Sequence, residues 1–195
     1  MANTTLGGLA SVAGGGKFAN GAITAAFQYL FNDRFHDKSA AIAAADSEGV
    51  TAPHFYAMDR ILICDFSNPA CTFGNVHFSV MATQIPGYAG VVVDGGIYLV
   101  RIPYYGTVGR VEVYDDGSSV TNETAPGHAL YYGYITRTIE VGKEGIYLSG
   151  YGEGQNAGLA PALLNAIFGP ILWNSQNLFT KDYFNKNFGP QSPSQ

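Results

Sequence analysis

Two arginines lie at strand positions where apolar side chains are expected. Side chains alternate between the two faces of a strand, so in "YITRTIEV" Arg137 shares its face with Ile135 and Ile139. In "IYLVRIPYY", Arg101 shares its face with Leu99. An arginine that faces a core is costly unless it is paired, because the guanidinium does not give up its proton. Each of these arginines therefore either pairs with a buried carboxylate as a structural element or lines a cleft and binds an anion.

For Arg137 the anion-binding alternative is favoured, because a histidine lies close by in the sequence. His128 precedes the strand in "APGHALYYG", where a Pro-Gly turn can present a side chain at the mouth of a cleft. Histidine is the side chain best suited to proton transfer near neutral pH. The alternative is a surface or capping histidine. His77 is expected to be a buried strand residue, and nothing singles out His36 or His54.

A glycine-rich segment follows the same strand. The sequence "GYGEGQNAG", Gly150–Gly158, is expected to link a strand to the C-terminal helix as a loop. Backbone N–H groups at Gly152 and Gly154 could then bind a substrate anion, although the carboxylate of Glu153 repels phosphate. The loop could instead bring Glu153 and Asn156 into a catalytic pocket beside Arg137. A flexible connector is the alternative.

A set of His128, Arg137, Glu153 and Asn156 around one end of a sheet suits two chemistries. One is acid–base cleavage of a phosphodiester, with arginine stabilising the transition state. The other is the handling of a nicotinamide dinucleotide, with arginine on a phosphate and Glu153 at the ribose. Arg101, Gly152 and Gly154 are the expected substrate-binding residues. The net charge of −5 favours the smaller ligand over nucleic acid.

The sequence gives no indication of a metal or a cofactor, and we expect neither. There is no CxxC pair or Cys/His cluster, so a structural zinc site is not expected. Cys64 and Cys71 in "CDFSNPAC" are equally compatible with a disulfide and with two free thiols. No run reaches the roughly 20 apolar residues of a spanning helix.

The elements that would hold these residues predict an α+β domain, mainly an antiparallel β-meander between an N-terminal helix and C-terminal helices. The N-terminal helix is expected at Lys17–Phe31, and the C-terminal helical region begins at Leu159 and breaks at Gly169-Pro170. Residues rich in Val, Ile, Tyr and Phe predict seven strands between these helices: Tyr56–Cys64, Val76–Thr83, Ala89–Val93, Ile97–Tyr104, Gly109–Tyr114, Leu130–Val141 and Ile146–Gly150.

The N-terminal segment "GGGKFANGAITAAFQYLFND", Gly14–Asp33, resembles a segment of Rhs-repeat and related polymorphic toxins of bacteria. In those proteins it lies at the end of the large delivery protein, just before the variable toxin domain. The remainder, above all "NETAPGHALYYGYITRTIEV", also looks like a toxin tip, although the resemblance carries no activity. It implies a linker and helix of the delivery protein at residues 1–48 and a toxin domain at 49–195.

Three functions follow as alternatives. The first is an enzymatic toxin, delivered by a bacterial secretion system into a rival cell and acting on a cytosolic target. The second is a membrane-disrupting toxin, supported by the low share of charged residues and the apolar segments Phe18–Phe31 and Leu159–Trp173. The third is a β-rich binding module. A toxin also implies a cognate immunity protein as a partner, because the producing cell must be protected.

Overall fold

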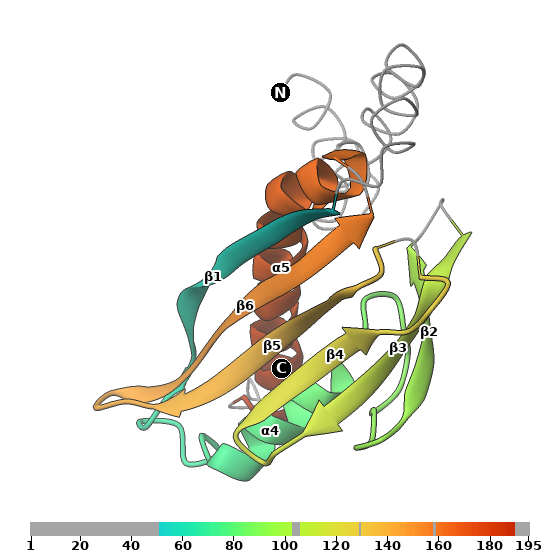
Figure 1. The fold of residues 1–195 in the computed structure, drawn as a ribbon. Coiled ribbons are helices and arrows are strands. Elements are labelled where there is room, and N and C mark those ends of the chain that lie inside the picture. Colours follow the sequence, from blue (N-terminus) through green and yellow to red (C-terminus); the bar gives the residue numbers. More distant parts are fainter. Residues whose placement is uncertain (1–50, 103–105, 129, 158, 190–195) are drawn as a thin grey trace, which may run out of the picture.

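The computed structural model describes residues 51–102, 106–128, 130–157 and 159–189. They form a six-stranded antiparallel sheet in the order β1-β6-β5-β4-β3-β2, and α5 and α4 cover one face of it (Figure 1). The expected α+β class and antiparallel meander are confirmed, whereas the expected N-terminal helix lies outside the described residues. The elements are β1 (Thr51–Asp65), α4 (Phe73–Ala82), β2 (Ile97–Ile102), β3 (Gly106–Asp115), β4 (Ser119–Thr124), β5 (Gly133–Val141), β6 (Gly145–Ala157) and α5 (Leu159–Phe188).

Strand alternation divides the sheet into a helix-covered face, here called the inner face, and an outer face. On β5 the buried Ile135 and Ile139 alternate with the partly exposed Tyr134, Thr138 and Glu140. Each fully buried aliphatic side chain stabilises the fold by about 1.5–3 kcal/mol. The main core comprises Ile63, Val76, Val80, Val111, Val113, Val120, Ile139, Ile146, Leu148 and Phe184, among others.

The segment expected as a strand at Val76–Thr83 is the helix α4, so that expectation was wrong. Thr72 caps the helix, and its Oγ1 accepts a hydrogen bond of 3.3 Å from the Asn75 N–H. Val76 and Val80 are four residues apart and both fully buried, which is the spacing of one helix face. The β-branched residues of this segment favour a strand, but the N-terminal cap and the packing of one buried face stabilise a helix instead. The strand expected at Ala89–Val93 was also wrong, because this segment contains no strand.

Three further differences concern polar or glycine-rich segments. The strand β4 was missed, because its sequence SVTNET has almost no apolar residues. Gly150–Ala157 is not a loop but the second half of β6, which pairs with β1 on one side and with β5 on the other. The helix α5 continues through Pro170, where a break was expected.

A disulfide joins the end of β1 to the segment that leads into α4. Cys64 and Cys71 are bonded, with Cα atoms 5.6 Å apart, and both residues are buried. The sequence left this pairing open. The bond closes a short loop, with a sequence separation of 7, and so fixes where α4 begins relative to the sheet.

We predict that the double substitution Cys64→Ser, Cys71→Ser lowers the free energy of unfolding by about 2–3 kcal/mol, since it releases a loop of this size in the unfolded chain. Urea denaturation of the oxidised protein and of the double variant would measure the difference. An unchanged midpoint in the variant would contradict a stabilising role for the bond.

Candidate functional site

Arg137 is the most buried charged group that the structure describes, with a relative exposure of 0%. Its Nε donates to Asn177 Oδ1 at 2.9 Å. Nη1 donates to the Thr83 carbonyl and to Gln84 Oε1, both at 3.2 Å, and Nη2 donates to Thr180 Oγ1. All four acceptors are neutral. The arginine is therefore neither paired with a carboxylate through these bonds nor exposed to an incoming anion.

Two of the four acceptors lie just after α4, and the other two lie on α5. Thr83 and Gln84 directly follow α4, and Asn177 and Thr180 lie on one side of α5, three residues apart. Gln84 is fixed in turn by a 3.1 Å bond from its Nε2 to Asn122 Oδ1 on β4. Burial lowers the pKa of Arg137 to about 9, so the group remains charged at neutral pH. Arg137 thus ties α4 and α5 to β5 from within the core.

The glycines expected to bind an anion instead make room for large side chains of β1. Gly150, Gly152 and Gly154 pair with Met58, Tyr56 and His54 on the inner face. A Cβ added at Gly152 would lie 2.2 Å from Cζ of Tyr56, and one added at Gly154 would lie 2.7 Å from Cε1 of His54. Their common role in the structure is packing.

Tyr56 and His54 form a small aromatic cluster beneath these glycines. The two rings are stacked with centroids 6.1 Å apart, and Trp173 of α5 hydrogen-bonds to the Tyr56 hydroxyl. Burial raises the pKa of Tyr56 and lowers the pKa of His54, while the Glu153 carboxylate acts in the opposite direction on His54. His54 was not singled out in the sequence, although its alternation with Phe55 places it on the buried face.

Glu153 lies on the outer face of β6, opposite in direction to its buried neighbours Gly152 and Gly154. Its Oε2 accepts a 2.8 Å hydrogen bond from the Tyr134 hydroxyl on β5. This bond raises the pKa of Tyr134 to about 12. Arg137 points to the other face of the same sheet, so the structure does not bring Glu153 and Arg137 together. Asn156 lies on β6, and its side chain is outside the described part.

Aromatic rings surround the Tyr134–Glu153 pair. Tyr151 meets Tyr134 edge to face and stacks on Phe55 of β1, each pair with centroids 6.1 Å apart. Phe55 is 66% exposed and Tyr151 is 36% exposed. The arrangement places one carboxylate among accessible rings, which is suited to a cationic or hydroxylated ligand. Tyr134 and Tyr151 could have been found from the sequence, because they share their strand faces with polar residues, whereas the parity of Phe55 in β1 is mainly apolar.

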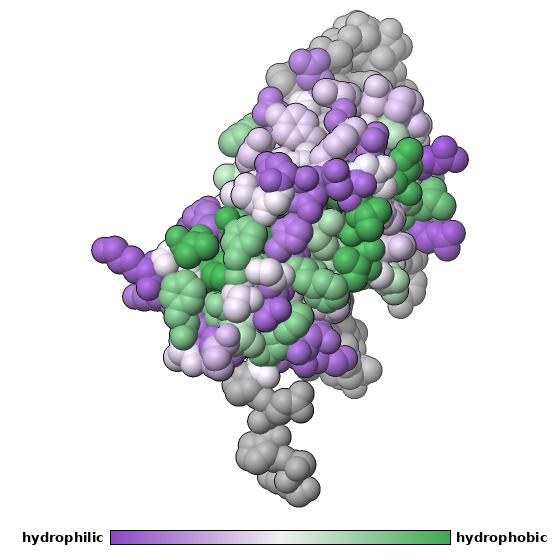
Figure 2. Space-filling model, turned by 90° about the horizontal axis from the view of Figure 1, so that it is seen from below, coloured by the Kyte–Doolittle hydropathy of each residue, from purple (hydrophilic) through white to green (hydrophobic). Residues whose placement is uncertain are grey.

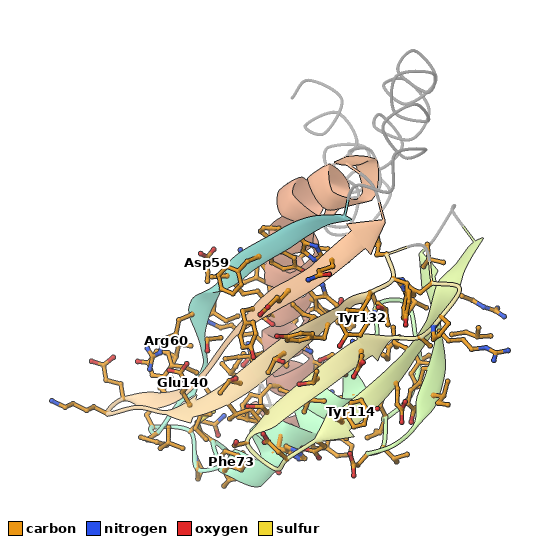
Figure 3. The ribbon with its side chains drawn as sticks, viewed as in Figure 1. Asp59, Arg60, Phe73, Tyr114, Tyr132 and Glu140 are labelled. Carbon is orange, nitrogen blue, oxygen red and sulfur yellow. A yellow bond between two sulfur atoms is a disulfide. The ribbon has the colours of Figure 1, made fainter. Side chains whose placement is uncertain are left out.

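A second outer-face cluster shows how a carboxylate is neutralised elsewhere on the sheet. Arg60 of β1 and Glu140 of β5 lie side by side across β6 (Figure 3), with Arg60 Nε 2.7 Å from Glu140 Oε2. The guanidinium also lies 3.5 Å from the centre of the Tyr147 ring. Glu140 is therefore held by a cation, whereas Glu153 is held by a neutral phenol.

His128 is placed by the loop between β4 and β5 and is half-buried. Its Nδ1 accepts a 3.0 Å hydrogen bond from the Leu130 N–H, so the neutral ring carries its proton on Nε2. Burial lowers its pKa. The backbone of His128 packs against Gly109, where a Cβ would lie 2.4 Å from the histidine Cα.

Arg101 is exposed on the outer face of β2, so the expectation that it faces a core was wrong. The residues that share its face are exposed too: Ile97 at 64% and Leu99 at 46%. Alternation does not identify the buried face of this edge strand, because both sets of alternating residues in IYLVRI are mainly apolar.

His77 was expected inside a strand and instead lies half-buried on α4. Its Nε2 is 3.0 Å from Oδ1 and 2.9 Å from Oδ2 of Asp115, and its ring stacks on Phe73. The pair joins α4 to the end of β3. No group of three or more potential metal ligands occurs among the described residues, and none of the helices in that part could span a membrane.

No family model matches the sequence, and no curated protein does either. Among solved structures, the chain is similar to the di-domain ARO/CYC StfQ from the steffimycin biosynthetic pathway, with 12% identity and a TM-score of 0.41. The match covers 80% of this chain and 54% of that one, so the chain spans about half the length of this neighbour.

Replacing the buried guanidinium should unfold or strongly destabilise the protein. We expect Arg137→Leu to lower the free energy of unfolding by about 3 kcal/mol or more, because it leaves buried oxygens of Asn177, Gln84 and Thr180 without their donor. The matched control is Arg110→Ala on β3, which removes an exposed arginine and should change stability by no more than about 0.5 kcal/mol. Equal unfolding midpoints for the two variants would refute the structural role of Arg137.

The packing role of the glycines makes a second prediction. Gly152→Ala should destabilise the fold, because its methyl group would collide with the Tyr56 ring, whereas Gly74→Ala on α4 meets nothing within 4 Å. The helix control should be neutral or stabilising by up to about 1 kcal/mol. Thermal unfolding would compare the two, and an equally stable Gly152→Ala variant would show that the ring is not confined there.

Proposed function

We propose that this chain is the toxin-bearing end of an Rhs-type polymorphic toxin, delivered by a secretion system into a rival bacterium. Residues 1–48 would belong to the delivery protein and 49–195 to the toxin domain. The observation that carries this proposal is the order of residues in Gly14–Asp33, with its Lys-Phe-Ala-Asn-Gly-Ala core and its Phe-Asn end. A cognate immunity protein would protect the producing cell.

We propose further that the toxin acts as an enzyme at the Tyr134–Glu153 pair and that its substrate is a nicotinamide dinucleotide. The oxidised nicotinamide ring is a cation, which suits exposed aromatic faces beside a carboxylate. RNA carries a phosphate at every residue, and both Glu153 and the net charge of −5 oppose its binding. Because Arg137 is fully buried, it has no part in this proposal.

The reaction is hydrolysis of the bond between nicotinamide and ribose. As that bond breaks, its electron pair moves to the ring nitrogen and neutral nicotinamide leaves. Positive charge then develops on the ribose carbon and its ring oxygen, and the Glu153 carboxylate stabilises it electrostatically. Water adds to the carbon and loses a proton, which Glu153 or solvent accepts. The Tyr134 hydroxyl fixes the carboxylate, and its high pKa keeps it a donor throughout.

The test follows nicotinamide dinucleotide content and membrane potential together in sensitive bacteria that express the full chain. We expect loss of the dinucleotide before growth arrest, with polarised membranes. Glu153→Gln should slow that loss by roughly 10²-fold. The control Glu144→Gln removes an exposed carboxylate from the turn between β5 and β6 and should act like the unchanged protein.

Each other outcome rejects a stated part of the proposal. A stable dinucleotide content during growth arrest would reject the substrate. Depolarisation that precedes every other change would reject the enzyme in favour of membrane disruption. A folded Glu153→Gln variant with full activity would reject the site, and His128→Ala would be examined next. No toxicity at all would reject the toxin itself.

A further inference from the structure

The strand β2 ends the described sheet with an edge whose first four residues, Ile97–Val100, contain no charge, proline or register shift. It pairs with β3, and no described strand lies on its other side (Figure 1). Edge strands are commonly protected by charges, prolines or bulges. The opposite edge, β1, has register shifts at Met58/Ile61 and at Leu62/Cys64. On β2 the run Ile97–Val100 pairs regularly with β3, and the single shift follows it.

This edge also carries a group of exposed aliphatic side chains. Seen from below, apolar side chains reach the molecular surface beside hydrophilic ones (Figure 2). According to their exposed fractions, the apolar side chains at the β2 edge come from the strand and from the segment before it. That segment is joined to β2 by a 2.8 Å hydrogen bond from the Val93 N–H to the Tyr98 hydroxyl. Their exposed fractions are 43% for Val91, 59% for Val93, 64% for Ile97 and 46% for Leu99.

We propose that β2 pairs with β2 of a second copy of this chain, so that two six-stranded sheets join into one across a two-fold axis. The strand is self-complementary in an antiparallel arrangement with Leu99 opposite Leu99 of the other copy. Two-fold pairing uses the same surface on both copies and therefore closes as a dimer. The backbone groups of the free edge supply the hydrogen bonds, and the exposed aliphatic side chains are buried.

Charge complementarity favours a second copy over another occupant. In this register Arg101 of one copy lies beside Ile97 of the other. Ile97 in turn lies opposite Glu112 on β3. Neighbouring strands are about 4.8 Å apart, so Arg101 and Glu112 of different copies are separated by about 10 Å at their Cα atoms. Two extended side chains can bridge that distance above Ile97, and the symmetry provides the interaction twice.

The first experiment measures the mass in solution of the full 195-residue chain, made by cell-free synthesis, by light scattering after gel filtration. We expect a mass twice the 20.7 kDa of one chain. Leu99→Glu places a carboxylate next to Arg110 within one copy, which the monomer tolerates, but sets two carboxylates against each other in the dimer. It should raise the dissociation constant of the dimer by about tenfold or more.

The matched control is Val141→Glu, since Val141 is equally exposed at 65% but lies on β5, away from the edge. It should leave the dimer intact. Circular dichroism must show the same fold for both variants. In a separate charge exchange, Arg101→Glu should weaken the dimer, and adding Glu112→Arg to that variant should restore the association. The proposal would be overturned if the unchanged chain had the mass of a monomer throughout an about 100-fold dilution series, or if Val141→Glu weakened the dimer as much as Leu99→Glu does.

Discussion

The guanidinium of Arg137, a single buried positive charge, links both helices to the sheet through hydrogen bonds. It lies inside the core and is satisfied by oxygens from the end of α4 and from α5. A buried charge without hydrogen bonds would be prohibitively costly, so each of these oxygens must stay in place if the sheet is to keep its inner face. The positions of α4 and α5 are therefore coupled to each other through one side chain of β5.

The same constraint accounts for other features of the inner face. The side-chain amide of Gln84 donates to Asn122 on β4, and its side-chain oxygen accepts from Arg137. Gln84 therefore extends the hydrogen-bond network from the end of α4 to the next strand. Thr83 and Thr180 share a 2.6 Å hydroxyl contact beside it. The disulfide before the other end of α4 fixes the position of that helix at a second point. The hydrogen-bonded pair of Glu153 and Tyr134 lies on the opposite, outer face.

The sequence predicts the parts of this fold that follow from local periodicity. The antiparallel meander, most of its strands and the buried face of Arg137 could be inferred from alternation alone. The role of Arg137 could not, because its acceptors are 40 to 54 residues away and are neutral side chains or carbonyls that carry no signal. The glycines of β6 were misleading for a related reason. Their role is defined by Tyr56 and His54, on a strand almost a hundred residues earlier.

The pairing of β1 with β6 also has a kinetic consequence. Thr51 lies opposite Ala157, so the first strand described finds its neighbour only after nearly the whole sheet has been made. Contacts this far apart in the chain are closed late and slow the folding of β-rich domains. A chain still emerging from the ribosome has β2 to β5 available but cannot complete the sheet or receive α5. Until β6 and α5 have left the ribosome, the domain has no finished core, and whatever activity it carries is delayed with it.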